Sequence, residues 1–544
     1  MLDRRTLLRN GALGGAAAAL ARRAHAAAVP PPPVSPSPAP SAGELDEVSV
    51  ADLRARMESG AESARSICEK YLARIEAVDR SGPTLKAVIE VNPDALAIAD
   101  ALDAERKAGR VRGPLHGIPV LVKDNVGSAD RMQTTAGSLA LVGAVPAADA
   151  HVVKRLRDAG AVLLGKTNLS EWANFRSSHS QSGWSGRGGQ TRNPYALDRD
   201  PSGSSSGSGA AAAASLCALT VGTETDGSIV SPSNNCGLVG FKPTLGLVSR
   251  AGIVPIAHSQ DTAGPMTRTV ADAGVLLSVL AGFDAADPAT RELAGKAPVD
   301  YTTFLDRKGL AGARIGVPRK KLYGQSPAAD AVAEAAIDLM RREGAVIVDP
   351  ADITTAGEAD DTEFEVLLYE FKADLNAYLA SLGPRNPYRN LEALIEFNRK
   401  NRAAEMPYFG QEIFEKAQAK GPLSEKAYVD ALAKNLRLTR AEGIDKTMDT
   451  HRLDCLVAPT SAPASLIDLV NGSYGAGGSS SIPAVAGYPD VTVPAGWHFG
   501  LPVGLSFFGR AGSEPTLFRI AYAFEQASQV RKPPRYLATA DLKP

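Results

Sequence analysis

The sequence of residues 200–232, DPSGSSSGSGAAAAASLCALTVGTETDGSIVSP, contains the most informative pattern in the chain. A glycine and serine tract opens it, followed by residues 210–216, an alanine-rich run of good helix formers. The β-favouring residues 219–221 then lead into a second small-residue turn that carries Gly227 and Ser228. A flexible linker has the same Gly/Ser composition, but a linker is not expected within regular structure. We therefore predict a compact helix–strand unit flanked by two serine-bearing turns.

Helix-like and strand-like patterns alternate on both sides of this unit. Residues 93–109 have an early proline, apolar residues at helical spacing and a terminal glycine, which together predict a helix. The apolar segments 118–122 and 161–164 predict short buried strands, and helical patterns dominate residues 361–450. Residues 504–508 predict a further strand. The alternation predicts a single large α/β domain with a mixed, mostly buried β-sheet covered by helices on both sides.

The composition is that of an ordinary globular protein. The chain has 544 residues, of which 44% are hydrophobic, and a formal net charge of −1. A charge this close to zero gives no electrostatic reason to expect nucleic acid or an anionic membrane as a partner. No stretch reaches about 18 uninterrupted apolar residues, so we expect a soluble mature protein.

The first 44 residues predict an export signal followed by a spacer. In residues 1–26, Arg4 and Arg5 precede a weakly apolar segment, and Ala24-His25-Ala26 has the small-x-small pattern of a cleavage site. This arrangement resembles a twin-arginine signal, although a chance arginine pair is the alternative. Residues 27–44 are proline-rich and predict an extended, disordered spacer. We expect a periplasmic or secreted protein whose folded domain comprises residues 45–544.

Neither metal nor cofactor motifs are found. The seven histidines show no metal-ligand spacing, and no phosphate-binding glycine loop is present. We therefore expect no metal and no cofactor. Four cysteines occur, Cys68, Cys217, Cys236 and Cys455. We expect mostly buried thiols, with Cys217 and Cys236 as the one pair to check for a disulfide.

Two serine positions compete for the role of nucleophile. Ser205 lies at the centre of a formal GxSxG match, but that tract does not follow a strand, as a nucleophile elbow requires. Ser228 does follow a predicted strand, in a turn whose backbone N–H groups can bind an oxyanion. A serine needs a base, and a lysine kept neutral by burial can serve. Lys123 follows the apolar strand 118–122, although a lone lysine is more often a solvated surface residue.

Taken together, these motifs resemble the amidase signature family of serine hydrolases. The family pattern is a Gly/Ser tract, an alanine-rich helix, a glycine- and serine-containing turn and an upstream lysine motif. Further similar segments are residues 113–125, 165–171, 237–244, 261–266 and 504–509. The resemblance extends over most of the chain after residue 45 and rests on long, ordered motifs.

The resemblance implies a Ser–Ser–Lys triad. Ser228 corresponds to the nucleophile, Ser204 to a bridging serine that follows a cis peptide bond, and Lys123 to the base. The oxyanion hole implied by the resemblance consists of four backbone N–H groups, those of Thr225, Asp226, Gly227 and Ser228. No cofactor is implied.

Four positions depart from the family pattern. Ser206 and Asp226 occupy positions where glycine is usual, Glu224 replaces an aspartate, and Val230 replaces a common arginine. The oxyanion donors belong to the backbone, so these changes remain compatible with catalysis. The segments 223–230 and 252–256 resemble the peptide amidase branch, whose members release ammonia from C-terminal peptide amides.

The expected function is therefore an exported amidase acting on C-terminal peptide amides or related small amides. A broad aliphatic or aryl amidase is the alternative within the enzyme class, and a non-catalytic amide- or peptide-binding protein is the alternative outside it. A tRNA-linked amidotransferase subunit would have no use for an export signal. Candidate pocket walls are the glycine-rich residues 471–481 and the helical region 361–450, while the oligomeric state stays open.

Overall fold

The computed structural model describes residues 43–383, 386–474 and 477–542. The predicted export signal lies outside the described residues, as does the predicted spacer except for its last two residues. All described residues belong to one unit, Ser37–Pro544. Among them, every helix is too short or too polar to cross a membrane.

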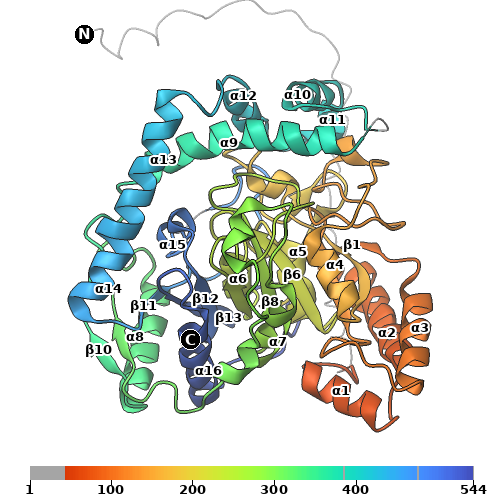
Figure 1. Ribbon diagram of the computed structural model, residues 1–544, viewed down its shortest axis with the longest axis horizontal. Coiled ribbons are helices and arrows are strands. Elements are labelled where there is room, and N and C mark those ends of the chain that lie inside the picture. The colour runs from red at the N-terminus through yellow and green to blue at the C-terminus, as the bar shows by residue number, and fades with distance from the viewer. Residues whose placement is uncertain (1–42, 384–385, 475–476, 543–544) are drawn as a thin grey trace, which may run out of the picture. The chain divides into compact units, whose positions relative to one another are not determined.

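A mixed eleven-stranded sheet forms the centre of this unit, in the order β1-β3-β2-β6-β8-β7-β12-β13-β11-β9-β10 (Figure 1). Its strands are β1 (Val88–Val91), β2 (Pro119–Lys123), β3 (Val162–Thr167), β6 (Leu219–Glu224), β7 (Val239–Lys242), β8 (Thr262–Thr267), β9 (Arg314–Gly316), β10 (Val346–Val348), β11 (Cys455–Pro459), β12 (Asp490–His498) and β13 (Leu501–Phe508). The short strands β4 (Trp184–Ser185) and β5 (Gly189–Gln190) pair separately. The predicted strands 118–122, 161–164 and 504–508 are confirmed as β2, β3 and β13.

The sheet contains both parallel and antiparallel pairs. β2 lies between β3 and β6 and is parallel to both, whereas β6 is antiparallel to β8. Every residue of β2, β3 and β6 is buried. Parallel strands covered on both faces have such continuous apolar sequences, which explains why these segments show no polar alternation.

Helices cover both faces of the sheet, as expected. They are α1 (Val50–Glu58), α2 (Ala64–Arg74), α3 (Ala95–Lys107), α4 (His151–Asp158), α5 (Ser206–Ala213), α6 (Val230–Asn235), α7 (Val270–Leu280), α8 (Pro327–Arg342), α9 (Asp360–Ser381), α10 (Leu391–Lys400), α11 (Arg402–Glu405), α12 (Glu412–Gln418), α13 (Lys426–Thr439), α14 (Asp445–His451), α15 (Ser481–Ala486) and α16 (Glu514–Ser528). On β7, Phe241 stacks on Phe518 of α16, while Gly240 faces Ser233 of α6. Neighbouring strand residues point to opposite faces, so α6 and α16 cover different sides.

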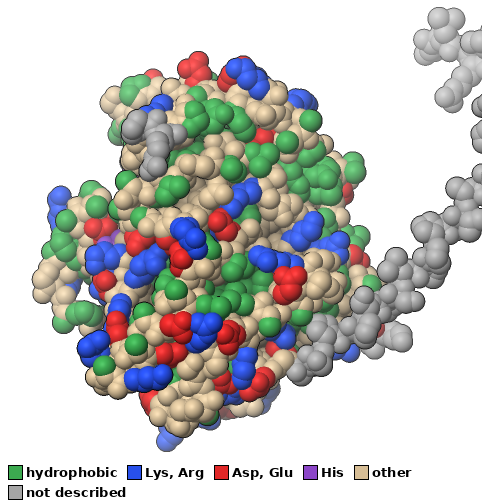
Figure 2. Space-filling model, turned by 90° about the vertical axis from the view of Figure 1, so that its right-hand side faces the viewer, with side chains coloured by type: hydrophobic (Ala, Val, Ile, Leu, Met, Phe, Trp, Pro, Cys, Tyr) green, Lys and Arg blue, Asp and Glu red, His purple; other side chains and the backbone are tan. Residues whose placement is uncertain are grey.

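A second helical layer comes from the predicted region 361–450. The helices α9 to α12 lie together at the top of Figure 1. Residues of α9, α10 and α12 form a second apolar cluster together with earlier segments of the chain, and in it Phe371 of α9 contacts both Phe175 and Phe414. On the face seen in Figure 2, Lys and Arg side chains are interspersed with Asp and Glu, in keeping with the net charge of −1.

The four cysteines are free, buried thiols. This confirms the expectation of buried thiols, and Cys217 and Cys236 do not form a disulfide. Burial raises the pKa of Cys217 to about 12. Such a thiol stays protonated and unreactive at neutral pH.

The helix within residues 200–232 begins earlier in the chain than helix propensity predicts. We expected residues 210–216, but α5 spans Ser206–Ala213 and therefore starts within the Gly/Ser tract. Small residues allow the helix to approach neighbouring backbone closely. A Cβ atom on Gly207 would lie 2.4 Å from the carbonyl oxygens of both Ala87 and Asn168. The tract is therefore a packing surface.

The substitution Gly207→Ala tests this close approach. The added methyl group meets backbone atoms that cannot rotate away, so we expect the free energy of unfolding to fall by about 1–3 kcal/mol. Urea denaturation followed by circular dichroism measures the loss. The matched control is Gly274→Ala in α7, where the nearest atom would lie at 3.6 Å. The control should be neutral or stabilising by up to about 1 kcal/mol; equal effects of both changes would contradict the packing argument.

Candidate active site

The two serine-bearing turns lie beside the end of β2. Lys123 is the last residue of β2, and its Nζ donates hydrogen bonds to Ser204 Oγ at 2.8 Å and to Thr223 Oγ1 at 2.9 Å. A third bond reaches the carbonyl oxygen of Thr223 at 3.2 Å. The Gly203–Ser204 peptide bond is cis, as the resemblance implied. Pairing of β2 with β6 places Lys123 beside Thr223, and the loop before α5 brings Ser204, 81 positions away in the chain, to the same amine.

Burial determines the protonation of this lysine. Lys123 has no exposed surface, and the loss of solvation lowers its pKa to about 7, although Asp261 and Glu224 act in the opposite direction. At neutral pH a large fraction of the amine is therefore uncharged. An uncharged amine can accept a proton from the serine hydroxyl that it contacts.

Ser228 lies in the turn that follows β6 and is 8% exposed. The N–H of Ser205 donates to its carbonyl oxygen at 3.2 Å, which joins the two turns through the backbone. Among the residues that the structure describes, the Ser228 hydroxyl makes no side-chain hydrogen bond, so the Ser204 and Ser228 hydroxyls are not directly bonded. The Ser228 hydroxyl is left available to a ligand.

Glu224 shapes the turn that carries Ser228. Its carboxylate accepts hydrogen bonds from the N–H groups of Gly227 at 2.9 Å, Ile229 at 2.7 Å and Val230 at 3.1 Å. Gly227 has φ +74°, a conformation that suits glycine. Of the four expected oxyanion donors, Gly227 therefore already donates its N–H to Glu224. Glu224 was expected only as a departure from the family pattern, and its contact with Gly227 was not predicted.

Asp226 ties the same turn to the C-terminal part of the chain. Its carboxylate accepts the hydroxyls of Ser480 at 2.6 Å and Ser481 at 2.7 Å. Burial raises the pKa of Asp226. The described part of residues 471–481, expected as a pocket wall, instead supports the turn through these two serines.

A cavity of about 330 Å³ opens beside the triad candidates. Ser204, Thr223 and Thr225 line one end. Lys123 and Ser228 lie behind this end and are not part of the lining. Asn125 contributes to the remaining wall, and much of the rest comes from residues 250–262 and from Asp374, Ala377 and Tyr378 of α9. The last three have the helical spacing i, i+3, i+4 and therefore share one face. The expectation that region 361–450 supplies a wall is thus correct, whereas none of the described residues of 471–481 lines this cavity.

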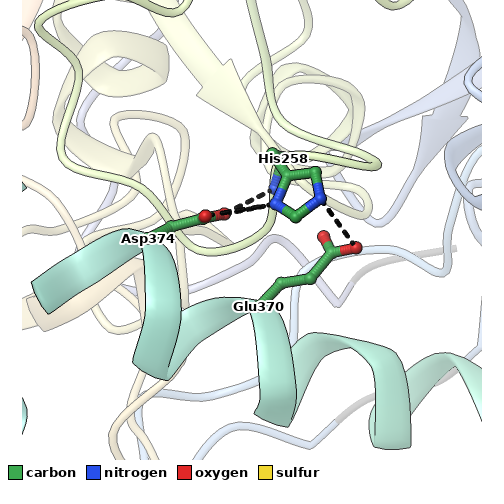
Figure 3. Close-up of side chains that lie close together, drawn as sticks. All are labelled: His258, Glu370 and Asp374. Atoms are coloured by element: carbon green, nitrogen blue, oxygen red, sulfur yellow. Dashed lines mark hydrogen bonds and ion pairs between the residues drawn. The ribbon is translucent and has the colours of Figure 1, made fainter. Parts of the chain in front are cut away.

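A histidine clamp joins α9 to the opposite wall of the cavity. His258 lies between two carboxylates of α9, with Nδ1 2.8 Å from Asp374 Oδ2 and Nε2 3.4 Å from Glu370 Oε1 (Figure 3). The hydrogen bond to Asp374 raises the pKa of His258. Sequence pattern did not predict this contact, because His258 and Asp374 lie 116 positions apart in the chain.

The same three side chains are a candidate metal group, because their ligand atoms lie within 4.8 Å of one another. Figure 3 shows the two carboxylates on different ring nitrogens. Three metal ligands converge on one point, whereas here each ring nitrogen already faces an acid. The geometry is that of an imidazolium held between two carboxylates, and we propose no metal there.

Comparisons with known proteins agree with this fold and site. A family model described as Amidase matches residues 66–518. A probable amidase of Arabidopsis thaliana is 43% identical over 507 residues, covering 92% of this chain and 93% of that protein. The structure of native peptide amidase from Stenotrophomonas maltophilia is 52% identical with a TM-score of 0.87, covering 91% of this chain and 99% of that one.

A second solved structure holds a ligand. It is the peptide amidase PAM in complex with the competitive inhibitor chymostatin, 52% identical with a TM-score of 0.87, covering 90% of this chain and 99% of that one. The family model alone spans well over half of the sequence. The chain belongs to the amidase signature family and is an amide-hydrolysing enzyme.

Proposed function

We propose that this amidase hydrolyses C-terminal peptide amides to the free acid and ammonia, with Lys123, Ser204 and Ser228 as its catalytic residues. The observation that carries the proposal is the 2.8 Å hydrogen bond between the buried Lys123 amine and Ser204 at the end of the cavity. The similarity to peptide amidase supports the substrate class. A protein that only bound amides would gain nothing from a buried amine with a lowered pKa.

The reaction begins with proton transfer along the triad. Neutral Lys123 takes the proton of Ser204, Ser204 takes that of Ser228 once the Ser228 hydroxyl turns to bond it, and Ser228 Oγ attacks the amide carbonyl carbon. The carbonyl oxygen becomes an oxyanion bound by the backbone N–H groups of the 225–228 turn. Thr225, Asp226 and Ser228 supply these donors directly, while the Gly227 N–H must first leave Glu224.

Collapse of the tetrahedral intermediate breaks the C–N bond. The proton held by Lys123 returns along the serines to the leaving nitrogen, so ammonia departs as a neutral molecule. Ser228 is left as an acyl ester. Water then attacks this ester with the same relay as base, which releases the free acid and restores the three residues.

The single substitutions Ser228→Ala and Ser204→Ala test the assignment. The first removes the nucleophile and the second interrupts the relay, so each should lower kcat by about 10³-fold or more. Ammonia release from a peptide amide is the measurement, with the matching free-acid peptide as the blank. Ser59→Ala, exposed beyond α1, is the control and should keep wild-type activity. Undiminished turnover by Ser228→Ala would exclude the acyl-enzyme.

The pH profile tests the base. Only the uncharged amine accepts a proton, and the pKa of Lys123 is about 7, so kcat/KM should rise with pH through about 7 and then level off. Lys123→Arg should be inactive over the whole range because a guanidinium stays protonated. A wild-type profile that is flat from pH 6 to 9, or an active arginine variant, would rule out Lys123 as the base.

We also propose that residues 1–26 direct export by the twin-arginine route, from the paired Arg4 and Arg5. Replacing both by lysine keeps the charge but removes the pattern. In a bacterial host with this route, the double variant should accumulate unprocessed inside the cell, whereas wild type reaches the periplasm. Fractionation followed by immunoblotting measures the distribution, and equal export of both forms would refute the assignment.

A further inference from the structure

Two buried polar atoms in the cavity wall lack hydrogen-bond partners. They are Oδ1 of Asn125 and the hydroxyl of Tyr378, and both residues line the 330 Å³ cavity. Leaving a buried polar group unpaired is costly, so each such group calls for an explanation. Their position in the wall of a ligand cavity offers one, because a bound ligand can supply the missing partners.

Asn125 lies next to the reacting groups. Its Nδ2 donates to Thr223 Oγ1 at 2.9 Å, the same hydroxyl that Lys123 Nζ contacts at 2.9 Å. The amide orientation is therefore set by Thr223, and Oδ1 remains as a hydrogen-bond acceptor. Asn125 is 3% exposed, so bulk water does not satisfy it.

Tyr378 approaches the cavity from α9. Its hydroxyl is buried, and burial raises its pKa, so it stays protonated at neutral pH and can donate a hydrogen bond. It lies on the helical face that also presents Asp374 and Ala377 to the cavity. Apolar side chains of Ile253, Val254 and Ile256 complete this part of the lining. A mostly apolar wall with a few fixed polar groups is typical of a specific small-ligand site.

We propose that Asn125 and Tyr378 bind the peptide unit that precedes the scissile amide, and are therefore specificity-determining residues of the proposed reaction. An acceptor and a donor match the N–H and the C=O of one further peptide unit. The backbone N–H groups of the turn at Ser228 bind the scissile carbonyl oxygen. The nitrogen of the scissile amide must receive the proton from the relay. This inference rests on the proposed function and names the residues that would distinguish peptide amides from simple aliphatic and aryl amides, which lack the second peptide unit.

Three matched substrates separate the two contacts. N-acetyl-leucinamide has the complete peptide unit, 2-acetoxy-4-methylpentanamide replaces its N–H by oxygen, and 4-methylpentanamide lacks the unit. All three keep the same primary amide, so ammonia release reports on each. For wild type we expect kcat/KM for the first substrate to exceed that for the ester-containing analogue by about 10- to 100-fold, because the analogue leaves Asn125 Oδ1 unpaired.

Variants assign the preference to individual atoms. Asn125→Leu removes the acceptor at similar size, and the ratio between N-acetyl-leucinamide and its ester analogue should fall to about one. Any general damage to the neighbouring Lys123 lowers both rates and cancels in this ratio. Tyr378→Phe should lower kcat/KM for N-acetyl-leucinamide about tenfold and leave that for 4-methylpentanamide unchanged.

Tyr369→Phe is the matched control. This tyrosine is also on α9, but its hydroxyl donates to Glu425 away from the cavity, so all three substrates should keep their relative rates. An unchanged ratio in Asn125→Leu, or equal losses for all substrates in Tyr378→Phe, would overturn the inference alone. Absence of ammonia release from every amide by wild type would overturn the proposed function, and the inference with it.

Discussion

The amine of Lys123 has no contact with solvent and donates hydrogen bonds to Ser204 and Thr223. The nearby carboxylates could hold it in the charged form if one of them formed an ion pair with it. They are occupied instead: Glu224 accepts three backbone N–H groups, and Asp261 accepts the Thr225 hydroxyl and two N–H groups. In the described part of the chain, no carboxylate pairs directly with Lys123. Desolvation therefore prevails and leaves the amine able to act as a base.

Glu224 and a second buried acid, Asp226, fix the geometry of the turn that carries the nucleophile. Glu224 folds the turn after β6 back on itself, and Asp226 attaches that turn to Ser480 and Ser481. Glu224 and Asp226, two of the four departures from the family pattern, therefore support the turn. The Glu224 side chain is longer than that of the usual aspartate and reaches the N–H groups of Ile229 and Val230. The site therefore depends on buried carboxylates that accept hydrogen bonds from neighbouring N–H and hydroxyl groups.

The contact between Lys123 and Ser204 was expected only from the resemblance to the amidase signature family. Local pattern was sufficient to predict β2, β3 and α3, because apolar periodicity carries that information. It was not sufficient for α5, whose start depends on close approach to the backbone of Ala87 and Asn168 rather than on helix propensity. The contacts of Asp226 with Ser480 and of His258 with Asp374 join residues more than a hundred positions apart. Such tertiary pairs leave no trace in local composition.

The helix α9 links substrate selection to the stability of the cavity wall. Asp374 and Glu370 hold His258 from the 250–262 segment, and Tyr378 follows Asp374 by one helical turn on the same face. The clamp therefore fixes the helix that positions the Tyr378 hydroxyl. Asn125 is fixed from the opposite side, by Thr223 and by its own carbonyl oxygen, which accepts the N–H of Val254 at 2.8 Å. Because both residues are held by contacts within the protein, their separation is set before a ligand enters, and a preorganised pair selects for a ligand of matching geometry.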